Sequence, residues 1–301
     1  MKFYFVIALA AFSFKILAAG LPPSAEVVLK NGDKRIGTYV SSNDGFETSS
    51  YWIVGPKGLV FIDTQFLPSA AQEALEWAEQ TTGKKVELAI VLHPNPDKFN
   101  GTGLYKKRGI KVVTADQVLA HIPHVHEIRT KAFFERYKPD YPTELVLPDS
   151  FGNATKELSA AGITVKAHVL GRGCSEAHVV VQFEDHVFPG DLITNGNHAW
   201  LELGLVDEWL KRLNEIEQLE PEFIHPGRGP SGDDGLIERQ RSYLIKVREL
   251  VRAAKPRLPV NKKKAKAIVE KLYTLYPGYG FPFFAQFGVP AVWEVMAAPK
   301  K

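Results

Sequence analysis

Four short polar segments carry side chains that could bind a metal ion or an anion. Each segment lies at the end of a predicted strand or beside one, and the loops of α/β proteins commonly carry functional groups. The four segments are His93–Lys98, Gly171–Ser175, Pro189–Leu192 and His225–Pro230. Zinc in proteins is usually held by four ligands drawn from His nitrogen, Cys thiolate and carboxylate oxygen. All three kinds occur here, beside Lys and Arg side chains that cannot ligate while they are charged.

The order and spacing of these segments resemble the metallo-β-lactamase superfamily over roughly residues 51–254. The family pattern reads His-x-His-x-Asp-His, Gly-His-Thr/Ser, Gly-Asp and Pro-Gly-His-Gly. Here the same segments read His-Pro-Asn-Pro-Asp-Lys, Gly-Cys-Ser, Gly-Asp and Pro-Gly-Arg-Gly. The resemblance implies a four-layer αββα sandwich, in the α/β class. For a complete site it also implies a hydrolase that acts through a zinc-bound water.

The first-zinc positions implied by the resemblance hold His93, Asn95, Cys174 and Asp191. Three of these are acceptable zinc ligands, whereas the Asn95 amide is a weak neutral one. Structural roles compete with ligation: His93 as a hydrogen-bonded core histidine, and Cys174 as a small buried filler. A site with one zinc, and with it a mono-zinc hydrolase, stays open as the alternative function.

The second-zinc positions hold Asp97, Lys98 and Arg228, again with Asp191. Two like unit charges 4 Å apart repel by about 4 kcal/mol at an effective dielectric constant near 20, and a dication facing two cations is repelled more strongly. Without a metal, the two carboxylates need compensation that Lys98 and Arg228 can supply. We therefore predict a buried ion-pair cluster in place of this metal, and none or one zinc as the cofactor.

The same cations suggest a ligand. A Lys–Arg pair in a loop-lined cleft suits a carboxylate or a phosphate, and His198 matches a family position near the substrate mouth. We predict that Lys98, Arg228 and His198 bind a small anionic molecule in a non-catalytic or altered-function homologue. Asp97 is the family position that orients the attacking water, and no catalytic residue is assigned. The oligomeric state stays open.

Charge and cysteine content limit the partners and the kinds of site that we expect. The 301 residues include 37 basic and 34 acidic side chains, so the net charge is +3. A value so close to neutral gives no reason to expect a partner that is a nucleic acid or a membrane surface. The single cysteine can form neither an internal disulfide nor a paired-cysteine zinc site.

The first twenty residues are typical of a secretory signal peptide. A basic start precedes an apolar run over residues 3–14, and Ala18–Gly20 supplies a small-residue cleavage site. We therefore expect an exported protein, periplasmic or secreted, with no membrane span after cleavage. The expected organisation is a signal peptide at 1–20, a metallo-β-lactamase-like domain at 21–255 and a C-terminal extension at 256–301 that packs on the domain.

Hydrophobic periodicity locates the elements that must position these side chains. Residues 51–54 and 59–62 predict a hairpin, and 86–92 a buried strand. Further strands are expected at 109–114, 163–170, 179–183, 186–188 and 223–225, and helices at 70–82, 206–219, 235–254 and 261–272. The histidines at 121, 124 and 126 are expected in a solvated loop. The aromatic segment 273–287 is expected to fold back on the core, with a cleft cap or a dimer face as alternatives.

Overall fold

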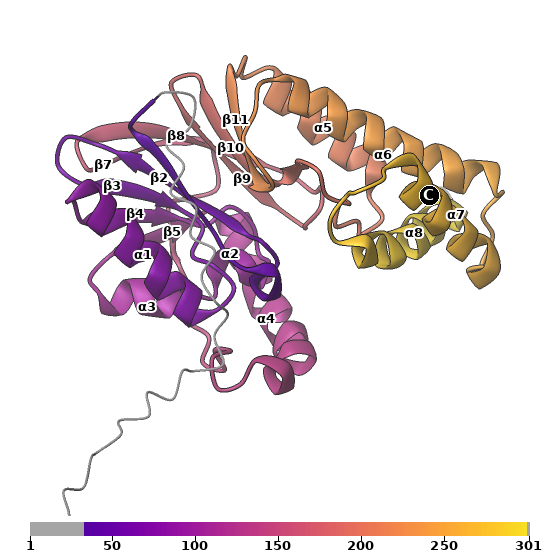
Figure 1. Ribbon diagram of the computed structural model, residues 1–301, viewed down its shortest axis with the longest axis horizontal. Helices are drawn as coiled ribbons and strands as arrows, with labels where there is room; N and C mark the ends of the chain where they lie inside the picture. The colour runs from indigo at the N-terminus through magenta and orange to yellow at the C-terminus, as the bar shows by residue number, and fades with distance from the viewer. Residues whose placement is uncertain (1–32, 300–301) are drawn as a thin grey trace, which may run out of the picture.

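The computed structural model describes residues 33–299. The predicted signal peptide therefore lies outside the described residues. Two β-sheets face each other, with helices on the outer side of each (Figure 1). This is the predicted four-layer sandwich. No helix among residues 33–299 is long and apolar enough to cross a membrane.

The first sheet has the strand order β1-β2-β3-β4-β5-β6. Its first three strands are antiparallel neighbours, and the predicted hairpin forms β2 and β3. From β3 onward the strands are parallel. The bounds are β1 Ile36–Val40, β2 Ser49–Val54, β3 Leu59–Ile62, β4 Val86–Ile90, β5 Lys111–Thr114 and β6 Asp149–Ser150. The carboxyl ends of β3 and β4 therefore reach the same edge of the sheet.

The second sheet has the order β11-β10-β9-β8-β7. Only β10 and β11 are parallel, so their carboxyl ends also meet at one edge. The bounds are β7 Lys156–Ala160, β8 Ile163–Leu170, β9 His178–Phe183, β10 His186–Thr194 and β11 Phe223–Arg228. Tyr51 of β2 packs edge-on against Phe188 of β10, with ring centroids 5.4 Å apart, which joins the two sheets through one hydrophobic core.

Helices close both outer faces. In the first half of the chain they are α1 Pro68–Thr82, α2 Pro96–Phe99, α3 Thr102–Lys107 and α4 Asp116–Tyr137, with a 3-10 turn at Asn43–Gly45. In the second half, α5 Val206–Glu217 and α6 Gly235–Ala253 pack against β10. The predicted helices at 70–82, 206–219 and 235–254 correspond to α1, α5 and α6.

The chain after residue 255 forms two further helices, α7 Lys262–Leu275 and α8 Pro282–Ala297. Leu272, Val289 and Trp293 of these helices are buried in the same hydrophobic cluster as α5 and α6. Periodicity had predicted α7 but not α8, because α8 contains Gly288 and Pro290 and is apolar nearly all round. The extension therefore adds to the core of the second half of the sandwich.

One expectation was wrong. Residues 121, 124 and 126 lie within α4, a continuous helix of 22 residues, and not in a loop. The helix accommodates Pro123 in its second turn. His126 is nearly buried, and its Nε2 lies 3.3 Å from the carbonyl oxygen of Thr143. The histidines therefore do not converge on a common site.

Candidate functional site

The first polar segment, His93–Lys98, follows the end of β4 and lies in the core. The strand ends at Ile90, and α2 begins after Asn95 with Pro96 at its first position, where a proline costs no hydrogen bond. This short helix turns Asp97 and Lys98 inward, and Lys98 has no exposed surface. The neighbouring strand β3 contributes Asp63, whose Oδ1 accepts a hydrogen bond from the backbone N–H of Leu92 at 2.9 Å.

The ammonium group of Lys98 lies among three carboxylates. Its Nζ is 2.9 Å from Asp191 Oδ1, 3.1 Å from Asp97 Oδ2 and 3.8 Å from Asp63 Oδ2. Burial alone would lower the pKa of Lys98, but the negative charges, first of Asp191 and then of Asp97, outweigh it and raise the pKa above its usual range. Lys98 therefore stays charged and acts as the counter-ion of the site.

Arg228, at the end of β11, supplies the second cation. Its guanidinium contacts Asp191 Oδ2 through Nη1 and Asp97 Oδ2 through Nη2, the latter at 2.7 Å. Its Nε donates to the carbonyl oxygen of Phe46 at 2.9 Å. A Cβ at Gly227 would lie 2.0 Å from Asp191 Oδ1, so the approach of β11 to Asp191 requires a glycine there.

The charges in this cluster balance. Burial raises the pKa of Asp97 and Asp191, but Lys98 and Arg228 outweigh that effect and hold both pKa values below the usual range. Asp63 differs, because burial dominates and raises its pKa to about 8. At neutral pH two cations therefore face two fully ionised carboxylates, and Asp63 is mostly protonated. The predicted mutual compensation of Asp97, Asp191, Lys98 and Arg228 is present as direct contacts.

The first-zinc residues are held by other partners. His93 Nδ1 lies 3.1 Å from the hydroxyl of Ser175, and its Nε2 is 3.7 Å from Asp191 Oδ2, too far for a hydrogen bond. Cys174 contacts His178, with Sγ 3.7 Å from Nε2. Burial raises the pKa of the Cys174 thiol well above its usual value, so the sulfur is a neutral thiol in this structure.

These donors do not fit a zinc ion in this arrangement. Lys98 and Arg228 form ion pairs with both oxygens of Asp191. A metal ion bound to Asp191 would therefore lie against the Lys98 ammonium and be repelled by it. Among residues 33–299 no three His, Cys, Asp or Glu side chains are grouped so that they could hold a metal ion. His93 thus lies near Asp191, whereas Cys174 contacts His178. The ligand set of His93, Cys174 and Asp191, with Asn95, stays a prediction.

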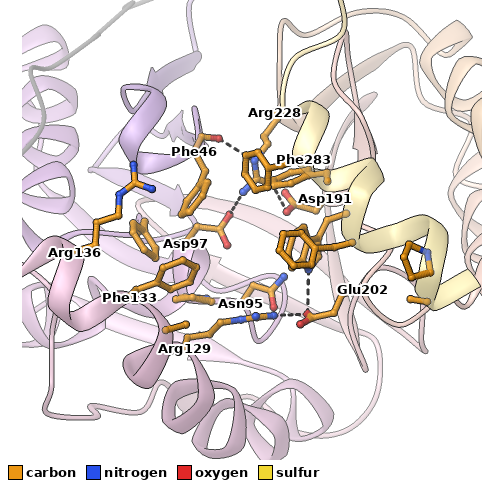
Figure 2. A pocket seen from close by; sticks show the side chains of 18 of the residues that line it. Phe46, Asn95, Asp97, Arg129, Phe133, Arg136, Asp191, Glu202, Arg228 and Phe283 are labelled. Atoms are coloured by element: carbon orange, nitrogen blue, oxygen red, sulfur yellow. Dashed lines mark hydrogen bonds and ion pairs between the residues drawn. The ribbon is translucent and has the colours of Figure 1, made fainter. Parts of the chain in front are cut away.

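A pocket of about 630 Å³ opens above the ion-pair cluster. Asp97, Asp191 and Arg228 form its floor beside Asn95 (Figure 2). Its walls are mainly aromatic and come from the loops after β1, β3 and β10 and from helices α4 and α8. The aromatic lining residues are Phe46, Phe66, Phe133, Trp200, Phe283, Phe284 and Phe287.

Two arginines of α4 stand in the wall of this pocket. Arg129 donates a hydrogen bond to the carboxylate of Glu202, and its guanidinium lies over the ring of Trp200, with Cζ 5.5 Å from the ring centroid. Arg136 is 65% exposed, and its one ion pair with a residue of 33–299 is to Asp44, 3.0 Å away and 47% exposed. Exposed pairs of this kind contribute little stability and exchange readily. Arg136 is therefore the pocket cation that is most easily recruited by a ligand.

Sequence reasoning missed this pocket, although the signal was present. Positions 129, 132, 133 and 136 have the spacing of one helix face, and so do 283, 284, 287, 290, 291 and 294. The first face was incomplete in the prediction, because only residues 131–137 were expected to be helical and the segment around the three histidines was interpreted as a loop. The second was hidden because α8 was not predicted.

Two predicted ligand-binding residues are placed elsewhere. Lys98 is buried beneath the floor and does not line the pocket. His198 is also absent from the lining. Its Nδ1 lies 2.8 Å from the hydroxyl of Tyr243, and the rings of Tyr273 and Tyr279 pack against it. Burial lowers the pKa of His198 to about 4, so it is neutral at physiological pH. Of the predicted trio, only Arg228 reaches the pocket.

Comparisons with known proteins agree with this architecture. The sequence profile of the metallo-β-lactamase superfamily matches residues 43–228. A metallo-β-lactamase from Pontibacter korlensis superposes with a TM-score of 0.58 at 19% identity, over 73% of this chain and 98% of that one. The FIM-1 metallo-β-lactamase from Pseudomonas aeruginosa, solved in a mono-zinc form, gives 0.57 at 17% identity, over 75% and 96%. No curated protein matched the chain.

Proposed function

Because the chain belongs to the metallo-β-lactamase superfamily, and because cations stand at two of the family's ligand positions, we propose that it acts without a metal as a binding protein for a small anionic molecule. One observation carries the proposal: Lys98 and Arg228 together engage both oxygens of Asp191 directly below the pocket. A hydrolytic site of this family needs those oxygens for zinc.

The pocket favours a ligand with an apolar, flat body. Aromatic side chains dominate its walls, and a volume of about 630 Å³ is within the usual range for small-molecule sites. The floor offers no surplus charge to such a ligand, because Arg228 is matched by Asp97 and Asp191. The acidic group of the ligand would therefore be held at Arg136, in exchange for the surface pair with Asp44.

Calorimetric titration tests this function. The probes are an aryl carboxylic acid, 1-naphthylacetic acid, and its neutral amide. We expect the acid to bind more tightly than the amide. The substitution Arg136→Gln should weaken binding of the acid by about tenfold, or ~1.4 kcal/mol. Arg172→Gln is the matched control, since Arg172 is also exposed and paired with one surface carboxylate. Equal binding of acid and amide, or no binding of either, would contradict the proposal.

A mono-zinc hydrolase is the competing function, and metal content separates the two. Elemental analysis of protein purified without chelator is expected to give far less than one zinc per chain. Incubation with zinc followed by gel filtration should not raise the value. One tightly held zinc per chain, together with chelator-sensitive hydrolysis of a chromogenic β-lactam, would overturn the metal-free proposal.

We also propose that the protein is exported and loses residues 1–20. The support is the basic start, apolar run and small-residue site at the N-terminus. Mass spectrometry of the protein recovered from the cells that produce it should show a chain that begins near residue 20 or 21. An intact Met1 on protein recovered from the cytoplasm would contradict export.

A further inference from the structure

Basic side chains are concentrated in the connection between α6 and α7 and in the residues on either side of it. Residues 252–266 contain seven basic and no acidic side chains, whereas the rest of the chain has 30 basic and 34 acidic ones. The small net charge of the whole protein therefore conceals one strongly cationic segment. This connection lies at the end of the molecule away from α1 and α3 (Figure 1).

Lys264 donates to the carbonyl oxygen of Ala254 and Lys266 pairs with Glu270, but most of the other cations form no ion pair within the described part of the fold. Lys255, Arg257, Lys262 and Lys263 are exposed, and none has a carboxylate of residues 33–299 within ion-pair distance. Lys262 and Lys263 occupy the first turn of α7, where the helix dipole favours acidic residues. Stability alone therefore does not account for this sequence.

An apolar side chain projects from the centre of the cationic segment. Leu258 is 58% exposed between Arg257 and Pro259. The backbone beside it is held firmly, because the buried indole of Trp293 donates to the carbonyl oxygen of Arg257 at 2.9 Å. On the other side, Asn261 caps α7 by accepting from the N–H of Lys264 at 3.0 Å. Leu258 is therefore presented to solvent by an anchored loop.

We propose that this tip, defined as residues 252–266, docks on an anionic phospholipid surface. Lys and Arg side chains are attracted to anionic headgroups, and their aliphatic stems can lie along the interface while the charges stay in water. Leu258 would enter the acyl boundary between them. A nucleic acid fits less well, because the segment has no aromatic side chain on which bases could stack. The tip is separate from the pocket, so this inference does not rest on the proposed ligand.

Vesicle flotation with the full-length chain tests the proposal. Vesicles of phosphatidylcholine mixed with phosphatidylglycerol are compared with vesicles of phosphatidylcholine alone, because the apolar N-terminal segment could bind both. We expect a preference for the anionic vesicles that falls as salt is raised. Reversing Lys255, Arg257 and Lys262 to Glu should reduce the anionic-specific partition by at least ~100-fold. Leu258→Ser should reduce it by about tenfold at any salt concentration.

The matched control reverses three exposed lysines elsewhere, Lys57, Lys107 and Lys111, which changes the net charge equally. This variant should keep most of its binding. Equal losses in the two triple variants would show a diffuse charge effect and overturn the proposal. So would equal binding to both vesicle types, or binding of the tip to duplex DNA without binding to anionic vesicles. Circular dichroism confirms that each variant is folded.

Discussion

The ammonium nitrogen of Lys98 lies 2.9 Å from Oδ1 of Asp191, with no exposure of the lysine to solvent. A side-chain cation thus stands against the carboxylate that bridges two metals in a complete site of this family. The consequences of that contact can be measured through stability, metal affinity and pH dependence.

Removing this cation should be costly. Lys98→Met keeps the shape of the side chain but leaves Asp97 and Asp191 with one counter-charge fewer in the core. Breaking a buried ion pair on one side typically destabilises a protein by about 3–5 kcal/mol, and we expect a loss of that order in urea unfolding. Lys107→Met, an exposed control, should change the value by less than about 0.5 kcal/mol. Similar losses in both would show that the cluster is not a buried one.

Restoring the family's ligands should restore zinc binding. Lys98→His with Arg228→His removes both cations and places two imidazoles beside Asp97, Asp191 and His93. We expect the double variant to retain zinc through gel filtration, whereas Arg228→His alone should not, because Lys98 still faces Asp191. A folded double variant without zinc uptake would show that more than these two ligands has been lost.

Asp63 should make stability fall as pH rises. Its folded-state pKa is about 8, because burial raises it from the usual 3.8. Between these values the folded protein holds a proton that the unfolded chain releases, so the unfolding free energy declines by at most ~1.4 kcal/mol per pH unit. Asp63→Asn keeps an acceptor for the N–H of Leu92 and should flatten this decline in urea unfolding series between about pH 5 and about pH 8. An unchanged slope of unfolding free energy against pH would show that a group other than Asp63 binds this proton.

Cys174 should react as a buried thiol and not as a ligand. It is 2% exposed, and burial raises its pKa. Alkylation by iodoacetamide should therefore be slow in the native protein, equally slow with a chelator present, and fast only after denaturation. Faster labelling after a chelator is added would show that a metal had protected the sulfur.

How much of the site the sequence could predict depends on where each residue lies in the chain. Asp97 follows a strand, and Asp191 and Arg228 lie within strands, whose order the motifs reveal, so their contact followed from the fold. Lys98 was placed correctly beside them in a buried ion-pair cluster, but the element that buries it was not foreseen. That burial depends on the short helix α2, which begins at Pro96 and is too brief to leave a periodic signal.

The pocket depended on long-range packing. Its walls join α4 with α8, which are separated by more than a hundred residues and belong to different halves of the sandwich. His198 shows the same limit. Its match to a family position suggested the substrate mouth, but Tyr243 of α6 and the tyrosines around α7 and α8 enclose it. No local pattern specifies which distant helix will cover a side chain.

Lys98, at the centre of the site, also has a consequence for the amount of mature protein that a cell can make when zinc is scarce. A metal cofactor must be acquired after synthesis and can be lost again, whereas Lys98 is joined to the chain by covalent bonds. The charge balance around Asp191 is therefore complete as soon as the polypeptide folds. Surroundings starved of zinc, or flooded with a chelator, should leave the amount of mature protein unchanged.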